Sequence, residues 1–308
     1  MKRTNIALIL MTVLVLALVF AGCTAEEQQA AVAAAESVAE SAGTTLEEVG
    51  AVAADTAAQV ADAVTDLDDY AYIKAKGKLI VGYTVYEPMN YFDAAGNFVG
   101  FDTDFAKAVC AKLGVEPEFV EINWDTKEVE LAAKSIDCIW NGLTVTEERK
   151  ANMAFSKSYI KNMQVAVIRT ADAGTYTDAA SMSAANLVAE VSSAGESAIK
   201  DDENLSKGNY VAVPKQTDAL LEVKSGTADV AILDYVLAKA MVGEGTDYAD
   251  LQIVEGLEFA AEEYAIGFRL DSSMVAKVDE AIDALIADGS LQKIAETYEQ
   301  GTVLLANQ

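Results

Sequence analysis

From Lys78 onward, apolar and polar residues follow patterns that predict strands and helices in turn. The segment 79–82 is a short β-rich run, and 102–113 places its apolar residues on one helical face. Asp102 can cap the start of that helix, and Gly114 follows its end. The alternation continues with strands predicted at 118–122 and 136–140 and a helix predicted at 126–135. It predicts a parallel α/β unit.

The pattern restarts in the second half of the chain. Strands are predicted at 164–168, 187–191, 230–233 and 264–268, and helices at 219–225, 235–242, 274–288 and 290–300. In the helix predicted before Gly289, apolar residues again lie on one face. The chain is therefore expected to contain a second α/β unit.

The N-terminus has the layout of a secretory signal. Lys2 and Arg3 precede an apolar run at 6–20, which is short for a membrane-spanning helix, and small residues follow it. The sequence Phe-Ala-Gly-Cys at 20–23 resembles the bacterial lipobox. That resemblance implies that residues 1–22 are a lipoprotein signal peptide and that Cys23 carries the lipid; a plain membrane anchor is the alternative.

Residues 23–69 form a separate compositional region. From residue 24 they contain eleven acidic residues, no basic residue and no aromatic residue, with many alanines. This composition cannot bury a core, so we expect an acidic, partly helical tether between the lipid and the folded domain. A coiled coil is the alternative, although Gly43 and Gly50 interrupt any heptad pattern.

Composition excludes several classes of function. Forty-nine acidic and twenty-two basic side chains give a net charge of -27, which opposes binding to nucleic acid. The chain has no histidine, so imidazole catalysis and histidine metal sites are excluded. We expect no metal and no cofactor. Cys110 and Cys138 are predicted to be free buried thiols, with a disulfide between them as the alternative.

Several motifs, in a consistent order, point to a family. They are Val-Gly-Phe-Asp-Thr-Asp-Phe-Ala at 99–106, Ser-Ile-Asp at 135–137, Asn-Gly-Leu-Thr-Val-Thr-Glu-Glu-Arg at 141–149, Ser-Gly-Thr-Ala-Asp-Val at 225–230, and Ala-Ile-Gly-Phe-Arg at 265–269. Together they resemble the bacterial extracellular solute-binding proteins of family 3, the periplasmic amino-acid-binding proteins of ABC importers. The resemblance covers residues 70 to 301.

The resemblance implies a two-lobed α/β fold of the type II periplasmic-binding-protein kind. Lobe 1 would comprise 70–162 plus 263–308, and lobe 2 would comprise 163–262, with two crossing strands between them. It implies a monomeric protein that captures a free, polar amino acid and passes it to the membrane permease of an ABC importer. With the lipid on Cys23, the protein would stay on the outer face of the cytoplasmic membrane.

The ligand-binding residues of lobe 1 are expected to follow a strand end. Arg149 closes a Thr-x-x-Arg sequence that matches the family motif, and its guanidinium suits a carboxylate. Asn141, Gly142 and Thr144 precede it, where α/β sheets bind ligands. From the residues alone, Arg149 pairing with nearby acids, Gly142 as a turn residue and Thr144 as a helix cap remain open.

In lobe 2, Asp234 follows a buried-strand pattern and matches the family's acceptor for the α-ammonium group. Ser193, Ala194 and Gly195 correspond to the family's anion-binding turn, although the usual Gly-Ser/Thr order is not kept. A structural helix cap is the alternative for this turn.

Two aromatic residues complete the expected site. Tyr86 aligns with the family's aromatic residue that covers the ligand, and Trp140 is either a wall of the site or part of the core. The leading function is capture without chemistry. A dehydratase of prephenate-like cyclic acids on the same fold, and a ligand sensor that acts through a membrane partner, are the alternatives.

Overall fold

The computed structural model describes residues 68–307. The predicted signal peptide, the lipidation site at Cys23 and almost all of the predicted tether lie outside these residues. Among the described helices, none is long and apolar enough to cross a membrane.

A five-stranded sheet forms the core of lobe 1, in the order β4-β1-β5-β12-β6. β1 runs parallel to β4 and β5, and β12 runs antiparallel to β5 and β6. The strands are β1 (Lys78–Tyr83), β4 (Glu116–Glu121), β5 (Cys138–Ile139), β6 (Met153–Phe155) and β12 (Gly267–Arg269). Its helices are α4 (Asp69–Lys76), α5 (Phe101–Leu113), α6 (Lys127–Ala132), α7 (Glu147–Lys150), α11 (Met274–Ala287) and α12 (Ser290–Thr297). A small hairpin pairs β2 (Tyr91–Phe92) with β3 (Phe98–Val99).

A second five-stranded sheet forms the core of lobe 2, in the order β11-β7-β10-β8-β9. β8 runs parallel to both β9 and β10, whereas β7 runs antiparallel to β10 and β11. The strands are β7 (Ile160–Arg169), β8 (Asn186–Glu190), β9 (Asn209–Val213), β10 (Val230–Asp234) and β11 (Leu251–Tyr264). The helices are α8 (Ala194–Asp201), α9 (Gln216–Ser225) and α10 (Tyr235–Met241). The predicted two-lobed α/β fold is therefore confirmed.

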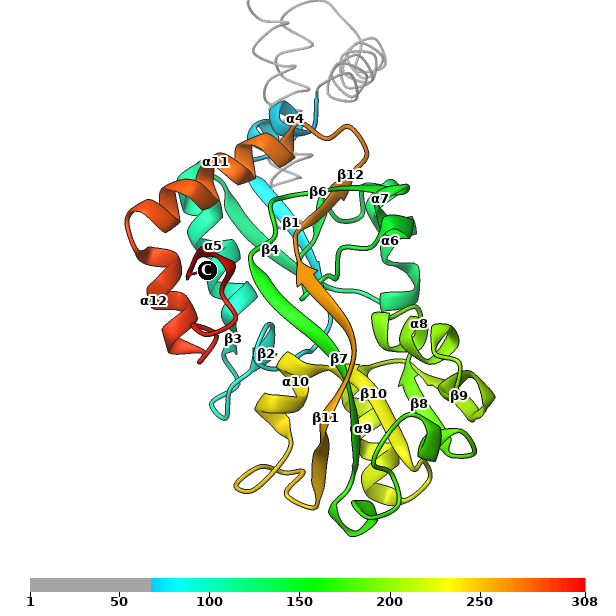
Figure 1. Cartoon of the computed structure of the whole chain (residues 1–308). Coiled ribbons are helices and arrows are strands. Elements are labelled where there is room, and N and C mark those ends of the chain that lie inside the picture. Colours follow the sequence, from blue (N-terminus) through cyan, green and yellow to red (C-terminus); the bar gives the residue numbers. More distant parts are fainter. Residues whose placement is uncertain (1–67, 308) are drawn as a thin grey trace, which may run out of the picture. The chain divides into compact units, whose positions relative to one another are not determined.

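The crossing strands are β7 and β11, which lie side by side in the second sheet and connect it with lobe 1 (Figure 1). Their pairing runs from Ile160 opposite Tyr264 to Arg169 opposite Leu251. The backbone N–H of Tyr159 donates to the carbonyl of Tyr264 at 2.9 Å, which extends the contact into lobe 1. The predicted lobe boundaries at 162/163 and 262/263 fall inside these strands and stay a prediction.

Two details of the predicted elements were wrong. Asp102 does not cap α5, because the helix begins at Phe101 after Gly100. Asp102 is therefore the second residue of the helix, and its side chain is buried. The carboxylate of Asp102 instead accepts a 2.7 Å hydrogen bond from the backbone N–H of Gly142. The segment 264–268 is not one strand, because Tyr264 ends β11 and a new strand begins at Gly267.

The two cysteines of the described chain are free and buried, as predicted. Burial raises the pKa of the Cys110 thiol to about 12 and that of Cys138 well above its usual value. Neither sulfur is therefore a reactive thiolate at neutral pH.

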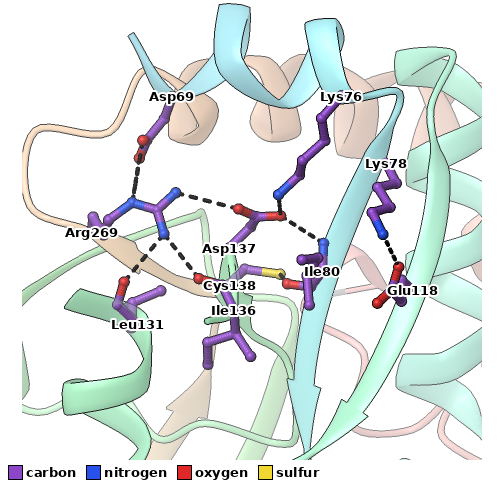
Figure 2. Close-up of polar contacts among 10 residues, drawn as sticks. All are labelled: Asp69, Lys76, Lys78, Ile80, Glu118, Leu131, Ile136, Asp137, Cys138 and Arg269. Atoms are coloured by element: carbon purple, nitrogen blue, oxygen red, sulfur yellow. Dashed lines mark hydrogen bonds and ion pairs between the residues drawn. The ribbon is translucent and has the colours of Figure 1, made fainter. Parts of the chain in front are cut away.

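Asp137 anchors the first described helix to the core of lobe 1 (Figure 2). Its fully buried carboxylate accepts from Lys76 Nζ at 2.6 Å and from the backbone N–H of Ile80 at 2.7 Å. Arg269 lies 3.6 Å from the other carboxylate oxygen and also pairs with Asp69 at 3.0 Å. This group, which we call the Asp137 cluster (Asp69, Lys76, Asp137 and Arg269), joins α4, β1 and β12.

We predict that Asp137→Asn destabilises the protein by about 3 kcal/mol, because Lys76 loses its buried partner and Arg269 keeps only Asp69. Glu118→Gln is the matched control: it removes the exposed Lys78–Glu118 pair, also seen in Figure 2, and is expected to cost less than about 1 kcal/mol. Urea unfolding measures both changes. Equal losses from the two variants would contradict an anchoring role for Asp137.

Candidate ligand site

A small cavity lies where the two lobes meet. Ten residues line it, namely Trp124, Asn141, Gly142, Thr144, Arg149, Glu190, Ser193, Ala194, Gln216 and Asp234. The room inside is about 10 Å³, about that of one water-sized sphere. Seven of the ten residues were predicted from sequence, and they come from both lobes.

Arg149 is held in lobe 1 but reaches lobe 2. It lies in the short helix α7, whose N-terminus is capped by Thr146, because the Thr146 hydroxyl accepts from the backbone N–H of Arg149. The guanidinium donates to the carbonyl of Thr144 at 2.8 Å and, across the cleft, to the carbonyl of Ser192 at 3.2 Å. Only 8% of Arg149 is exposed, and this burial lowers its pKa.

Asp234 ends β10 and is surrounded by amide donors. One carboxylate oxygen accepts from Asn162 at 2.7 Å and from Gln164 at 2.6 Å, both on β7, and the other accepts from Gln216. Burial nevertheless raises the pKa of Asp234. Its neighbour Glu262, on β11, accepts from the same two β7 amides, and burial together with Asp234 raises the pKa of Glu262 to about 7.

The turn after β5 carries the lobe 1 wall of the cavity. Gly142 adopts a φ of 58°, and a Cβ there would lie 2.7 Å from Tyr86 Cε1, so only glycine fits. Asn141 donates to the hydroxyl of Thr84 at 2.7 Å and accepts from Asn90 at 2.9 Å. The turn is therefore fixed by buried polar groups below it.

The turn before α8 forms the facing wall. The Ser193 hydroxyl accepts from the backbone N–H of Glu196 at 3.1 Å, so this side chain is a helix cap. Ser192 has a φ of 56°, and its hydroxyl donates to Asp125 of lobe 1 at 2.6 Å. Its carbonyl accepts from both Lys127 and Arg149, each at 3.2 Å. Ser192 thus forms polar contacts that hold the two lobes together.

Three predicted site residues do not line the cavity. Tyr86 lies behind Gly142, fully packed, with its hydroxyl 2.6 Å from that of Tyr264. Trp140 is buried in the lobe 1 core, where its ring meets Phe105 edge-on at 5.1 Å. Gly195 faces β10, and a Cβ there would lie 2.5 Å from the carbonyl oxygen of Ile232. These residues support the walls of the cavity from behind.

Trp124, Glu190 and Gln216 line the cavity but were missed. Trp124 supplies the aromatic wall expected at Tyr86, and of the two alternatives for Trp140, wall or core, the structure has the core. Glu190 did leave a signal, because it is the only charged residue in the predicted strand 187–191 and such strands seldom bury a carboxylate. Gln216 follows no strong pattern, and only the fold brings it to Asp234.

Four charged groups here, Lys127, Arg149, Asp234 and Glu262, are bonded to neutral partners. Within residues 68–307, no ion pair joins any of five buried or largely buried side chains, namely Lys127, Arg149, Glu190, Asp234 and Glu262. The two cations donate to backbone carbonyls, and Asp234 and Glu262 accept from amides and a hydroxyl. Their charges are thereby solvated without being neutralised.

Curated proteins similar to this chain bind amino acids. The arginine-binding extracellular protein ArtP of Bacillus subtilis is 26% identical over 234 residues, which cover 73% of this chain and 88% of ArtP. The L-cystine-binding protein TcyJ of Escherichia coli is 25% identical over 228 residues, which cover 73% of this chain and 84% of TcyJ.

Solved structures show the same similarity. A substrate-binding protein of an ABC uptake transporter from Streptococcus pneumoniae, with bound histidine, has a TM-score of 0.68 and 30% identity over 77% of this chain and 98% of its own. The ancestral amino-acid-binding protein AncCDT-1, a precursor of cyclohexadienyl dehydratase, has a TM-score of 0.67 and 27% identity over 74% of this chain and 98% of its own.

The family model of the bacterial extracellular solute-binding proteins, family 3, matches residues 79–301. The match spans both sheets except Lys78, together with the crossing strands and every residue that lines the cavity. The chain therefore belongs to the bacterial extracellular solute-binding proteins of family 3.

Proposed function

We propose that this protein captures a free amino acid between its lobes and delivers it to the permease of an ABC importer, without transforming it. The observation that supports this most directly is the pair of unneutralised charges in one cavity, Arg149 from lobe 1 and Asp234 from lobe 2. An α-carboxylate and an α-ammonium group are the complementary pair.

Hydrogen bonds within the protein orient each charged side chain toward binding one group of the ligand. The Arg149 guanidinium is oriented by two carbonyls and presents a planar set of donors to a carboxylate. The Asp234 carboxylate is fixed by three amides and can accept a hydrogen bond from an ammonium group. Because the two groups belong to different lobes, a ligand that bonds both stabilises the closed arrangement.

The cavity also implies how the ligand enters. An amino acid does not fit into about 10 Å³, so the lobes must separate further than they do here before it can bind. The polar contacts of Ser192 with Asp125, Lys127 and Arg149 must break in that movement. The crossing strands β7 and β11 are the covalent connections about which it occurs.

We predict that Arg149→Ala and Asp234→Asn each weaken amino-acid binding by roughly 100-fold or more, because each leaves a ligand charge buried without its partner. The measurement is calorimetry against the common amino acids, on protein unfolded and refolded to remove any bound ligand. Lys150→Ala, an exposed neighbour of Arg149, is the control and should bind normally.

A different result would identify the alternative enzyme. If every amino acid fails to bind while a prephenate-like cyclic acid binds and is converted, capture without chemistry is wrong. If Arg149→Ala binds amino acids as tightly as the unchanged protein, capture stands but Arg149 is not the residue that holds the carboxylate.

The proposed location depends on the N-terminus. We predict that the full chain, expressed with its leader in a bacterium, sediments with the membrane fraction and is labelled by radioactive palmitate. Cys23→Ser should abolish labelling and release the protein, because several acyl chains are needed for stable attachment. Cys110→Ser, which changes a buried thiol, should remain labelled. Unchanged labelling of Cys23→Ser would overturn the proposed anchor.

Two buried acids, Glu190 in the cavity lining and Glu262 behind it beside Asp234, also make stability depend on pH. Burial raises the pKa of Glu190 from 4.5 to about 8, and that of Glu262 from 4.5 to about 7. Between pH 4.5 and the raised pKa, each of these groups is protonated in the folded protein but ionised in the unfolded chain. The free energy of unfolding therefore decreases as pH rises through this range. Lys127 acts in the opposite sense only above pH 8, since its pKa is lowered from 10.5 to about 8.

We therefore predict that the melting temperature of the ligand-free protein falls between pH 5 and pH 8. Glu262→Gln and Glu190→Gln should each flatten that dependence, because a neutral amide has no proton to lose. Differential scanning calorimetry across this range gives the slopes. A slope that is the same in the unchanged protein and both variants would show that these two carboxyl groups do not titrate as described.

A further inference from the structure

We propose that Glu190 selects amino acids with a positively charged side chain, by binding the side-chain cation inside the cavity. This inference rests on the proposed function, since it assigns the third charged group of the same cavity. Arg149 and Asp234 complement the backbone groups that all amino acids share. Glu190 is the remaining charged residue of the lining.

Glu190 lies beside Asp234, but the two carboxylates differ in their hydrogen-bond partners. The two residues end the neighbouring parallel strands β8 and β10, so their carboxylates stand at the same edge of the sheet. Asp234 is bonded by three amides. The carboxylate of Glu190 has no hydrogen bond or ion pair with any part of the described chain, although only 4% of the residue is exposed.

A buried carboxylate without a partner is costly, and a protein retains it at low cost only as the neutral acid or beside a cation. Lys127 and Arg149 attract Glu190 electrostatically, but both are bonded to carbonyls and neither forms an ion pair with it, so its burial is not offset. Since Glu190 lines the cavity, a cation on the ligand is the partner that can reach it.

The charges of the lining agree with this assignment. Arg149 contributes one positive charge and Asp234 one negative charge, and Glu190 contributes a second negative charge when a cation binds beside it. The complement has one negative and two positive charges, which is the charge set of arginine, lysine or ornithine. A neutral amino acid would leave Glu190 unpaired, and an acidic one would place two carboxylates together.

The test compares ligands that differ only in this charge. Arginine and citrulline have nearly the same shape, but citrulline is neutral; lysine and norleucine form a second pair. Affinities are measured by calorimetry at pH 7.5 on the refolded mature chain carrying Cys23→Ser. We expect arginine to bind roughly 30-fold or more tightly than citrulline, because truncating one partner of a buried charge pair is strongly unfavourable.

Glu190→Gln keeps the size of the side chain and should reduce the ratio of arginine to citrulline affinity to within about threefold. Glu148→Gln is the matched control: it removes the same charge from an exposed position next to Arg149, outside the cavity, and should leave the ratio unchanged. This control separates a contact with Glu190 from the long-range field of the acidic protein.

The outcomes are distinguishable. Equal affinity for arginine and citrulline in the unchanged protein overturns the role of Glu190 without requiring any variant to fold. A ratio that survives Glu190→Gln overturns it as well. If neutral amino acids bind and Arg149→Ala abolishes that binding, the proposed capture function stands and only the selection by Glu190 fails. If no amino acid binds at all, the proposed function itself fails.

Discussion

Charges buried between the two lobes, and not paired with each other, are the constraint on which the rest of this structure depends. A buried ion must be solvated by something. Here carbonyls solvate Arg149 and Lys127, and the amides of Asn162 and Gln164 solvate Asp234 and Glu262. Since these partners are neutral, they do not cancel the charges of Arg149 and Asp234. Both side chains can therefore still attract ligand groups of opposite charge.

The remainder of the fold holds these groups in place. Asp234 and Glu190 stand at strand ends, and the turn around Gly142 is fixed from below by Asp102, whose pKa burial raises to about 7. Asn162 and Gln164 lie on a crossing strand, so the strand that joins the lobes also supports the acidic half of the site. The strand that connects the two lobes thus also carries residues that support the candidate ligand site.

Much of this was predictable from sequence. Arg149, Thr144 and Asp234 follow strands with a clear pattern or match ordered family motifs, and the structure brings them together. The crossing strand β11 was missed because its 14 residues mix acidic and apolar side chains without a strict alternation. Trp140 and Trp124 could not be told apart, because both follow plausible elements and only three-dimensional packing decides which one faces the cavity.

The Asp137 cluster has a mechanical consequence. Any tension applied to the chain at its N-terminal side enters the described domain through α4, and the ion pairs of Asp69 and Lys76 transmit it directly to the lobe 1 sheet. The covalent connections from lobe 1 to lobe 2 are β7 and β11, which pair with each other. Lobe 1 therefore stays fixed relative to the N-terminal segment, and lobe 2 is the lobe that moves when the cleft opens. A pull on the N-terminal segment is then not transmitted to the crossing strands.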